Sequence, residues 1–407
     1  MMQDQEPQDR RRDRTPTAPV DQEEALQHGL LALRRGLAGG VAGFDRWAEA
    51  EADSDPLPIY DLNGKLLFNE FTMRDGERVA GVVRTSASRV LGAPVIAIQE
   101  GPRKWDPQKA LAEARARAAK RVEGADILSM EFVCYSYPKI GVRIDVVGAA
   151  SLIYDAATFE PVDRFGSDEL EGFTAYSFYD EIATRDAPEK ERRFDLAVRE
   201  LEMVRKTVPE VLSPRVAASA IARFKEALTA AYHFEFLPLT SSKVLKYAPR
   251  CSPHDCFALY AQQTDVYCAV ATGQMILDFY RYHFTQDQIA AAMGTGAGGT
   301  TNPGQVNGYQ SLSNNGLVAT YDTSADWAEA KAEIDANRPV KSGIPGHARA
   351  CAGWMRQNIF LVGQSPRRWL KIYDPWPWNA DICQGGAVVW EDWESVTHTN
   401  FIYVRHA

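Results

Sequence analysis

The spacing of hydrophobic positions changes along this chain between a helical period and a strand-like alternation. These changes divide the chain into regions. Residues 21–53 place apolar side chains three to four positions apart, at Leu26, Leu30 and Leu33, which predicts helix. Residues 189–234 return to the same helical period in two segments. The region between them alternates in shorter runs, which is typical of strands.

Residues 57–163 combine these short runs with two turn signals and one helix. Asn63-Gly64 and Asp75-Gly76 separate apolar runs, and such pairs supply the positive φ angles that tight hairpin turns require. The Ala-, Lys- and Arg-rich residues 107–121 predict a helix. A small sheet with one helix packed across it is the most economical architecture. The predicted strands are residues 59–62, 66–71, 79–84, 130–135, 141–146 and 152–154.

These patterns predict an α+β protein divided into five segments. They are a disordered polar tail (1–20), a helical segment (21–56), a small α+β domain (57–165), a helical connector (166–248) and a C-terminal domain (249–407). A chain of 407 residues is long enough for two or three such domains.

The composition of the chain argues against two classes of function, nucleic-acid binding and membrane spanning. The formal net charge of -9 lacks the basic excess of a nucleic-acid-binding surface, so we expect no nucleic acid partner. No apolar run has the length of a membrane helix, and no hydrophobic segment follows the arginines at 10–12, as a signal peptide would require. We therefore expect a cytoplasmic protein without a membrane partner, with secretion by an unrecognised route left open.

The six cysteines are scattered, which argues against a fold built on disulfides. Cys251 and Cys256 form a C-x4-C pair, but no second ligand pair with matching spacing follows. We therefore expect no metal and no other cofactor. Whether Cys251 and Cys256 pair with each other is open.

One cysteine lies where a reactive thiol is expected. Residues 268–282 are apolar almost all round, which predicts a buried central helix with Cys268 in its first turn. Free N–H groups and the positive end of the helix dipole stabilise a thiolate there. The alternative is a packed core thiol, because free cysteines are often buried.

Residues that could assist Cys268 in catalysis occur before and after it in the chain, which favours a catalytic thiol. Gln262 precedes Cys268 by six residues and is placed to aim an amide N–H at a developing oxyanion. His347 follows in a Gly-flanked segment that leads into an apolar strand, and Asp374 ends the next strand. A thiol, an imidazole and a carboxylate form a nucleophile, base and orienting group. Gln263 is the rival to Gln262.

Two other histidines are weaker candidates for the base. His398 follows the aspartate, and His283 stands at the far end of the predicted helix.

Together these residues resemble the papain superfamily, whose order is an oxyanion-hole Gln, a Cys at a helix start, a His, and then an Asn or Asp. The Gln262–Cys268 spacing matches that family, and Asp374-Pro375-Trp376 resembles its Asn-Ser-Trp, whose Trp shields the orienting bond. With an Asp in the orienting position and a short domain, the sequence most resembles bacterial peptidases that process bacteriocin leaders. The resemblance implies a papain-like catalytic domain, with the central helix packed on an antiparallel sheet.

Two departures from the family put substrate preference in doubt. The Gly-Ser-Cys-Trp signature around the nucleophile is absent, since Tyr267 precedes Cys268 and Ala269 follows it. The stretch between His347 and Asp374 is longer than in the leader peptidases.

The sequence thus predicts a cysteine endopeptidase acting on a peptide or protein substrate. An acyltransferase of the transglutaminase-like kind, an amidase with the same thiol constellation, and a catalytically silent peptide-binding module are the alternatives.

The region before the catalytic domain resembles, more faintly, the pro-segments of some bacterial papain-like peptidases. We expect it to restrain the enzyme as in a zymogen, so that a chain beginning near Leu237 would be more active. The alternative is that both parts share one continuous core.

Overall fold

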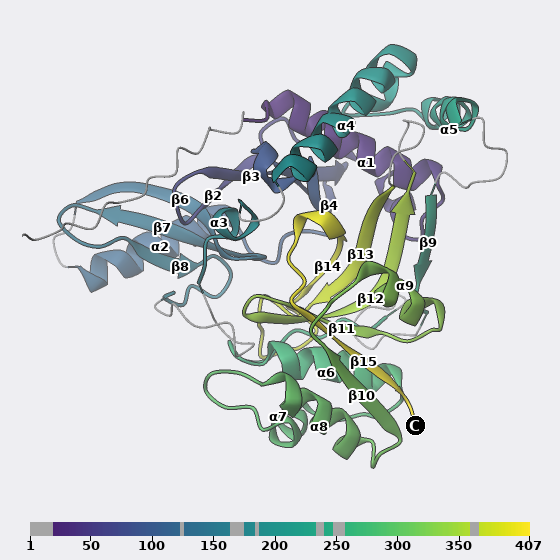
Figure 1. The fold of residues 1–407 in the computed structure, drawn as a ribbon. Helices are drawn as coiled ribbons and strands as arrows, with labels where there is room; N and C mark the ends of the chain where they lie inside the picture. The colour runs from purple at the N-terminus through teal and green to yellow at the C-terminus, as the bar shows by residue number, and fades with distance from the viewer. Residues whose placement is uncertain are drawn as a thin grey trace, which may run out of the picture.

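The structure is a computed structural model that describes residues 19–122, 126–162, 175–183, 187–232, 240–246, 257–358 and 366–407. Within these ranges the chain forms a mixed α+β fold around one large sheet (Figure 1). The predicted α+β class is therefore confirmed, whereas the papain-like arrangement and the domain boundaries stay predictions. None of the helices in these ranges has the length and apolar character needed to cross a bilayer.

The sheet runs without interruption through both halves of the chain. Its strands are β1 (Glu51–Ala52), β2 (Leu57–Asp61), β3 (Leu66–Asp75), β4 (Arg78–Ser86), β5 (Val95–Glu100), β6 (Ile127–Ser136), β7 (Lys139–Val146), β8 (Leu152–Asp155), β9 (Thr240–Val244), β10 (Leu317–Asp322), β11 (Val340–Ile344), β12 (His347–Gln357), β13 (Arg367–Asp374), β14 (Ala387–Asp392) and β15 (Asn400–His406). Their order is β10-β15-β11-β12-β13-β14-β5-β4-β3-β2-β6-β7-β8, with β1 beside β3 and β9 beside β12. Strands β2 and β6 run parallel, and the other pairs are antiparallel.

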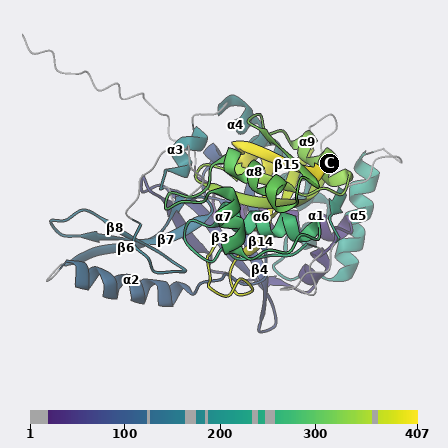
Figure 2. The same cartoon turned by 90° about the horizontal axis from the view of Figure 1, so that it is seen from below.

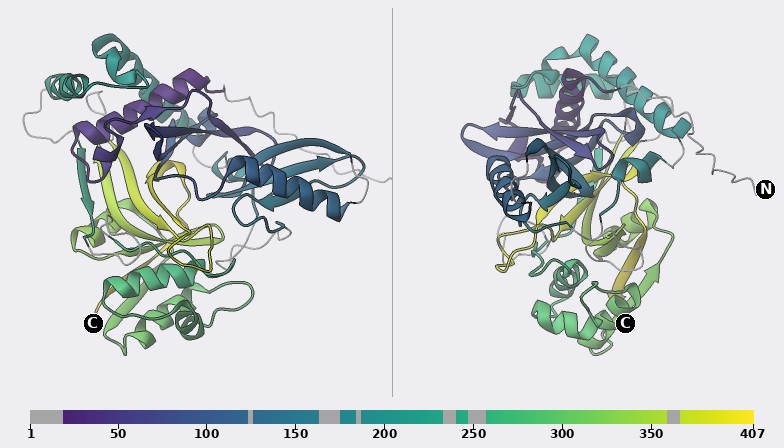
Figure 3. Two further views of the ribbon diagram at one scale, coloured as in Figure 1. Left: turned by 180° about the vertical axis from the view of Figure 1, so that it is seen from behind. Right: turned by 90° about the vertical axis from the view of Figure 1, so that its left-hand side faces the viewer.

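Helices gather at opposite ends of the molecule (Figures 1 and 3). The α-helices are α1 (Gln22–Ala38), α2 (Pro107–Arg121), α3 (Phe178–Ala183), α4 (Ala187–Thr207), α5 (Ala218–Tyr232), α6 (Cys268–Phe279), α7 (Gln286–Met293), α8 (Asn302–Leu312) and α9 (Trp327–Asp335), and the 3-10 turns are η1 (Phe44–Trp47), η2 (Arg89–Leu91), η3 (Pro209–Leu212) and η4 (Trp393–Ser395). Helices α1, α4 and α5 lie at one end, and α6, α7 and α8 at the other. Helix α2 lies along the arm formed by β6, β7 and β8 (Figure 2).

The two predicted hairpins form as expected. Gly64 has φ +80° between β2 and β3, and Gly76 has φ +59° between β3 and β4. Glycine adopts such angles without the steric cost that a Cβ would add. The predicted helix at 107–121 is also confirmed: Asp106 caps α2 by accepting a hydrogen bond from the Lys109 N–H at 2.7 Å.

Strands β14 and β5 join the N-terminal and C-terminal parts of the sheet. They pair antiparallel, with Val388 opposite Glu100 and Glu391 opposite Ala97. Helix α1 and turn η1 cover this junction, and Trp47 and Trp390 are both fully buried in the same cluster. Gly81 lets the Trp47 ring pack directly against the backbone of β4, because a Cβ at this position would lie 2.0 Å from that ring. The two parts therefore share apolar core as well as strands.

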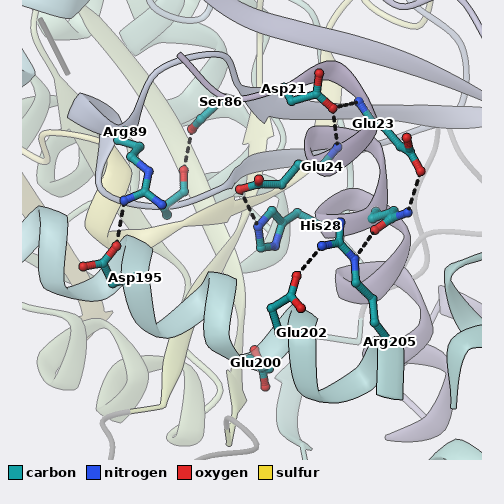
Figure 4. A network of polar contacts seen from close by, with 12 residues as sticks. Asp21, Glu23, Glu24, His28, Ser86, Arg89, Asp195, Glu200, Glu202 and Arg205 are labelled. Carbon is teal, nitrogen blue, oxygen red and sulfur yellow. Dashed lines mark hydrogen bonds and ion pairs between the residues drawn. The ribbon is translucent and has the colours of Figure 1, made fainter. Parts of the chain in front are cut away.

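Polar contacts attach α1 to α4 (Figure 4). Arg205 donates to the Gln27 side-chain oxygen at 2.7 Å. His28 is fully buried at this interface, with its ring edge-on to Phe194. Burial lowers the pKa of the His28 imidazole to about 4, although the Glu24 carboxylate 3.7 Å away opposes this shift. The contact between the helices therefore contains a histidine that is neutral at pH 7.

The cysteines differ in state. Cys134, Cys268 and Cys351 are buried thiols outside any disulfide, whereas Cys383 is disulfide-bonded. The possible metal pair, Cys251 and Cys256, lies outside the described residues. Within the described part of the chain, no group of three or more His, Cys, Asp or Glu side chains is arranged to hold a metal ion.

Candidate active site

Helix α6 places Cys268 at its first residue. Tyr267 precedes it as the N-cap, and its side chain does not cap the amide groups of the first turn, which point toward the start of the helix. This position favours the thiolate form. The helix ends at Phe279 rather than at the predicted Tyr282, because Arg281 adopts a left-handed φ of +71°.

The core around α6 holds the nucleophile against the strand that carries the base. Val270, Met275 and Ile276 pack in one cluster with residues of β12 and β13. Cys268 itself packs with Ala348, the residue that follows His347. The start of α6 and the start of β12 are therefore neighbours.

The structure brings His347 and Asp374 together. His347 Nε2 lies 2.8 Å from Asp374 Oδ1, and both side chains are buried. Burial alone would raise the pKa of Asp374, but the neighbouring His347 and Arg349 and the Trp376 N–H hold it below its usual value. Burial lowers the pKa of His347 despite the adjacent carboxylate. The pair is thus a carboxylate beside a neutral imidazole at pH 7.

This protonation fixes the tautomer of His347. An ionised carboxylate only accepts hydrogen bonds, so Nε2 must carry the proton that points at Asp374. Nδ1 is then the basic nitrogen, and it has no hydrogen-bond partner among the described residues. The arrangement leaves a proton acceptor on the side of the ring away from Asp374.

Trp376 is hydrogen-bonded to the aspartate of this pair. Its backbone N–H donates to Asp374 Oδ1 at 2.8 Å, and its side chain is buried. The backbone at Gln262 is fixed to the same segment, because the Gln262 N–H donates to the Pro375 carbonyl at 3.1 Å. Gln262 is therefore held beside the segment that carries the aspartate.

The Gln262 amide is already engaged. Its Nε2 donates to the carbonyls of Thr264 at 2.7 Å and Asp265 at 3.1 Å. Its Oε1 is buried without a partner among the described residues. The rival, Gln263, turns toward the Ala380 carbonyl at 3.3 Å. An oxyanion role for Gln262 requires its N–H groups to leave these carbonyls.

The rival histidines have structural contacts elsewhere. His283 pairs with Asp278 beyond the end of α6. His398 stacks on Trp393 with ring centroids 4.4 Å apart, and its Nδ1 lies 3.0 Å from the Ser342 hydroxyl. Neither contacts Asp374 in the described residues.

Sequence reasoning missed two charged groups at the site. Arg349, two residues after His347 on β12, forms a buried bidentate pair with Glu391 at 2.6 and 2.9 Å. Lys139 reaches the site from the N-terminal half, and its Nζ lies 4.7 Å from the centre of the Trp376 ring. Arg349 could have been suspected from its position next to the histidine on a buried strand. Lys139 follows an ordinary Tyr-Pro turn, which gives no such signal.

Comparisons with known proteins find a family match over the part of the chain that contains the candidate residues. Residues 254–396, which include all four candidate site residues, match the model of the Peptidase_C39 like family. None of the curated proteins matches the chain. Among solved structures, the crystal structure of the peptidase domain of Streptococcus ComA, a bi-functional ABC transporter involved in quorum sensing, is 17% identical, with a TM-score of 0.26. The match covers 37% of this chain and 98% of that one, and a TM-score this low supports no conclusion about the fold. The C-terminal part of the chain is thus similar to the Peptidase_C39 like family of cysteine peptidases, which confirms the resemblance predicted from the sequence.

Proposed function

We propose that this protein is a cysteine endopeptidase with Cys268 as nucleophile, His347 as general base and acid, and Asp374 as orienting group. The observation that carries the proposal is the buried 2.8 Å contact between His347 and Asp374 next to the helix start that bears Cys268. The similarity to a peptidase family supports the same chemistry.

In the proposed reaction His347 Nδ1 takes the thiol proton of Cys268. The thiolate attacks the peptide carbonyl carbon, and the carbonyl oxygen becomes an oxyanion. His347 then donates its proton to the leaving amine as the C–N bond breaks, which leaves a thioester on Cys268. Water, deprotonated by His347, hydrolyses the thioester and restores the thiol. Asp374 keeps the imidazole in the required tautomer throughout.

The backbone N–H of Cys268 is the principal oxyanion donor in this proposal. It belongs to the first turn of α6, where amide groups have no acceptor within the helix. The amide of Gln262 assists after exchanging its bonds to the carbonyls of Thr264 and Asp265 for the oxyanion. No metal or organic cofactor enters the proposed reaction.

A matched pair of cysteine substitutions tests the assignment. Cys268→Ala is expected to abolish peptide hydrolysis, whereas Cys134→Ala removes another buried thiol and is expected to leave it intact. Hydrolysis of a fluorogenic peptide mixture measures both. Wild-type turnover by the Cys268→Ala variant would refute the proposal. Incorporation of a labelled amine into the peptide would instead favour the acyltransferase alternative.

We also propose that the N-terminal region restrains the peptidase. Lys139 of that region contacts Trp376, whose backbone N–H donates to Asp374, and β14 and β5 pair across the junction. Because the two parts share core residues, removing the N-terminal region would expose apolar surface and destabilise what remains. Point substitutions in the full chain therefore test the restraint better than a truncation near Leu237.

A further inference from the structure

The turn between β6 and β7 is the part of the N-terminal half that reaches the proposed active site. Tyr137 and Pro138 form the turn, and Lys139 begins β7 opposite Ser136. Lys139 is only 1% exposed, although lysine is almost never buried without compensation. Its burial therefore requires a specific environment.

That environment belongs largely to the catalytic part of the chain. The Lys139 ammonium lies over the face of Trp376, a geometry that attracts a cation to the ring. Burial lowers the pKa of Lys139, while the nearby Cys268, Asp374, Asp155 and Asp265 oppose that shift. A positive charge from the N-terminal half is thus placed among the acidic groups of the site.

A second contact holds the turn in place. The Tyr137 hydroxyl donates to Glu391 Oε2 at 3.0 Å, and Glu391 is itself fixed by the bidentate pair with Arg349. The Tyr137 ring also stacks on Phe178, with centroids 4.7 Å apart. The turn is therefore anchored to β14 of the catalytic part and to α3.

With the turn in this position the site is closed. Cys268 and Asp374 are each 1% exposed, and His347 and Gln262 are fully buried. A cavity beside the turn, lined by residues that include Pro138 and Trp376, has a volume of about 70 Å³. That space is of a size for a few water molecules.

We propose that the Tyr137–Lys139 turn is the element that closes the active site, and that a peptide substrate enters only when the turn withdraws. This inference rests on the proposed peptidase function. The Lys139 charge also explains how a docked turn suppresses turnover. It favours the thiolate of Cys268 but disfavours the imidazolium of His347, the acid that the leaving amine needs.

Alkylation of Cys268 by iodoacetamide tests closure without requiring hydrolysis. Lys139→Glu places a carboxylate among the acidic groups of the site and is expected to expel the turn, raising the alkylation rate roughly tenfold or more. Tyr137→Phe removes only the hydrogen bond to Glu391 and is expected to raise the rate severalfold. Lys65→Glu is the matched control, because Lys65 contacts the Tyr179 ring, at 4.1 Å, and is exposed.

The rates are read by mass spectrometry at about pH 7.5. Lys139→Glu disfavours the Cys268 thiolate, so a faster rate in that variant reports access rather than ionisation. Cys134 and Cys351 are buried free thiols and report unfolding. Faster labelling of Cys268 alone, with the control at the wild-type rate, would support the proposal. Wild-type labelling of Cys268 in both turn variants would overturn it. Labelling of all three thiols together in both variants would also overturn it, because the exposure would then come from unfolding.

Peptide hydrolysis measured on the same proteins separates the two proposals. Faster labelling of Cys268 without hydrolysis in any variant would retain the closing turn and refute the peptidase. Equal hydrolysis by the wild type and both turn variants would refute the closing turn and retain the peptidase.

Discussion

The buried His28 makes the stability of the protein depend on pH in a calculable way. Burial lowers its pKa to about 4 in the folded chain, against an ordinary value of 6.5. Between these values the unfolded chain binds a proton that the folded chain does not bind. Stability contributed by His28 is therefore complete above about pH 6.5 and is lost as the pH falls toward 4.

The expected size follows from the two pKa values. Their difference corresponds to about 3.4 kcal/mol when the loss is complete, and about 2 kcal/mol of this is lost by pH 5. Asp392 acts in the opposite direction, because burial and the nearby Glu394 raise its pKa to about 7. Folding then favours proton uptake by Asp392, and stability from this group rises as the pH falls. The wild type alone therefore cannot reveal the His28 effect.

Comparison of the wild type with His28→Leu isolates the pH-dependent stability that His28 contributes. Urea unfolding followed by tryptophan fluorescence gives the free energy of unfolding at about pH 7.5 and about pH 5. The advantage of the wild type over His28→Leu should be about 2 kcal/mol larger at the higher pH. Phe194→Leu is the control, because it disturbs the same contact without removing a titrating group. A wild-type advantage over His28→Leu that is equal at both pH values would refute the reasoning.

Three further predictions concern the site. His347→Ala is expected to lower kcat for peptide hydrolysis by roughly three orders of magnitude or more. Asp374→Asn should retain measurable activity, because an amide oxygen still accepts a hydrogen bond from His347 Nε2. Equal mild losses in the two variants would mean that the base is wrongly assigned. Arg349→Met should lower the free energy of unfolding in urea by about 3–5 kcal/mol, because it leaves the Glu391 carboxylate buried without its partner, and adding Glu391→Gln should recover most of the loss. No recovery in the double variant would contradict this cause. Gln262→Ala should lower kcat by less than the roughly hundredfold typical of a lost oxyanion donor, because the Gln262 amide is bound to backbone carbonyls. A larger loss would show that the amide turns to the oxyanion.

Features encoded by neighbouring residues were predictable from the sequence. Asn63-Gly64 and Asp75-Gly76 supplied the positive φ angles of two hairpins, and Asp106 with Pro107 defined the start of α2. The contact between His347 and Asp374 was also predictable, because His347 begins one apolar strand and Asp374 ends the next. Their catalytic roles stay predictions.

Features that depend on distant residues were not predictable in this way. Pairing of β14 with β5 joins segments almost 300 residues apart in the chain, and no local pattern specifies that register. Lys139 follows a turn, where lysine is normally solvated, and only the fold places it against Trp376. The engagement of the Gln262 amide likewise depends on the backbone path of residues 264 and 265, which spacing alone does not determine.

Mapping the cysteine that reacts with a peptidyl electrophile tests the central claim most directly. The intact protein is incubated to completion with a thiol-directed peptidyl electrophile, and the modified residue is identified by mass spectrometry. Modification of Cys268 alone is predicted, with Cys134 and Cys351 unmodified and with no adduct on the His347→Ala variant at the same exposure. Modification of Cys134 or Cys351 in the folded protein, with Cys268 left unmodified, would contradict the assignment of Cys268 as the nucleophile.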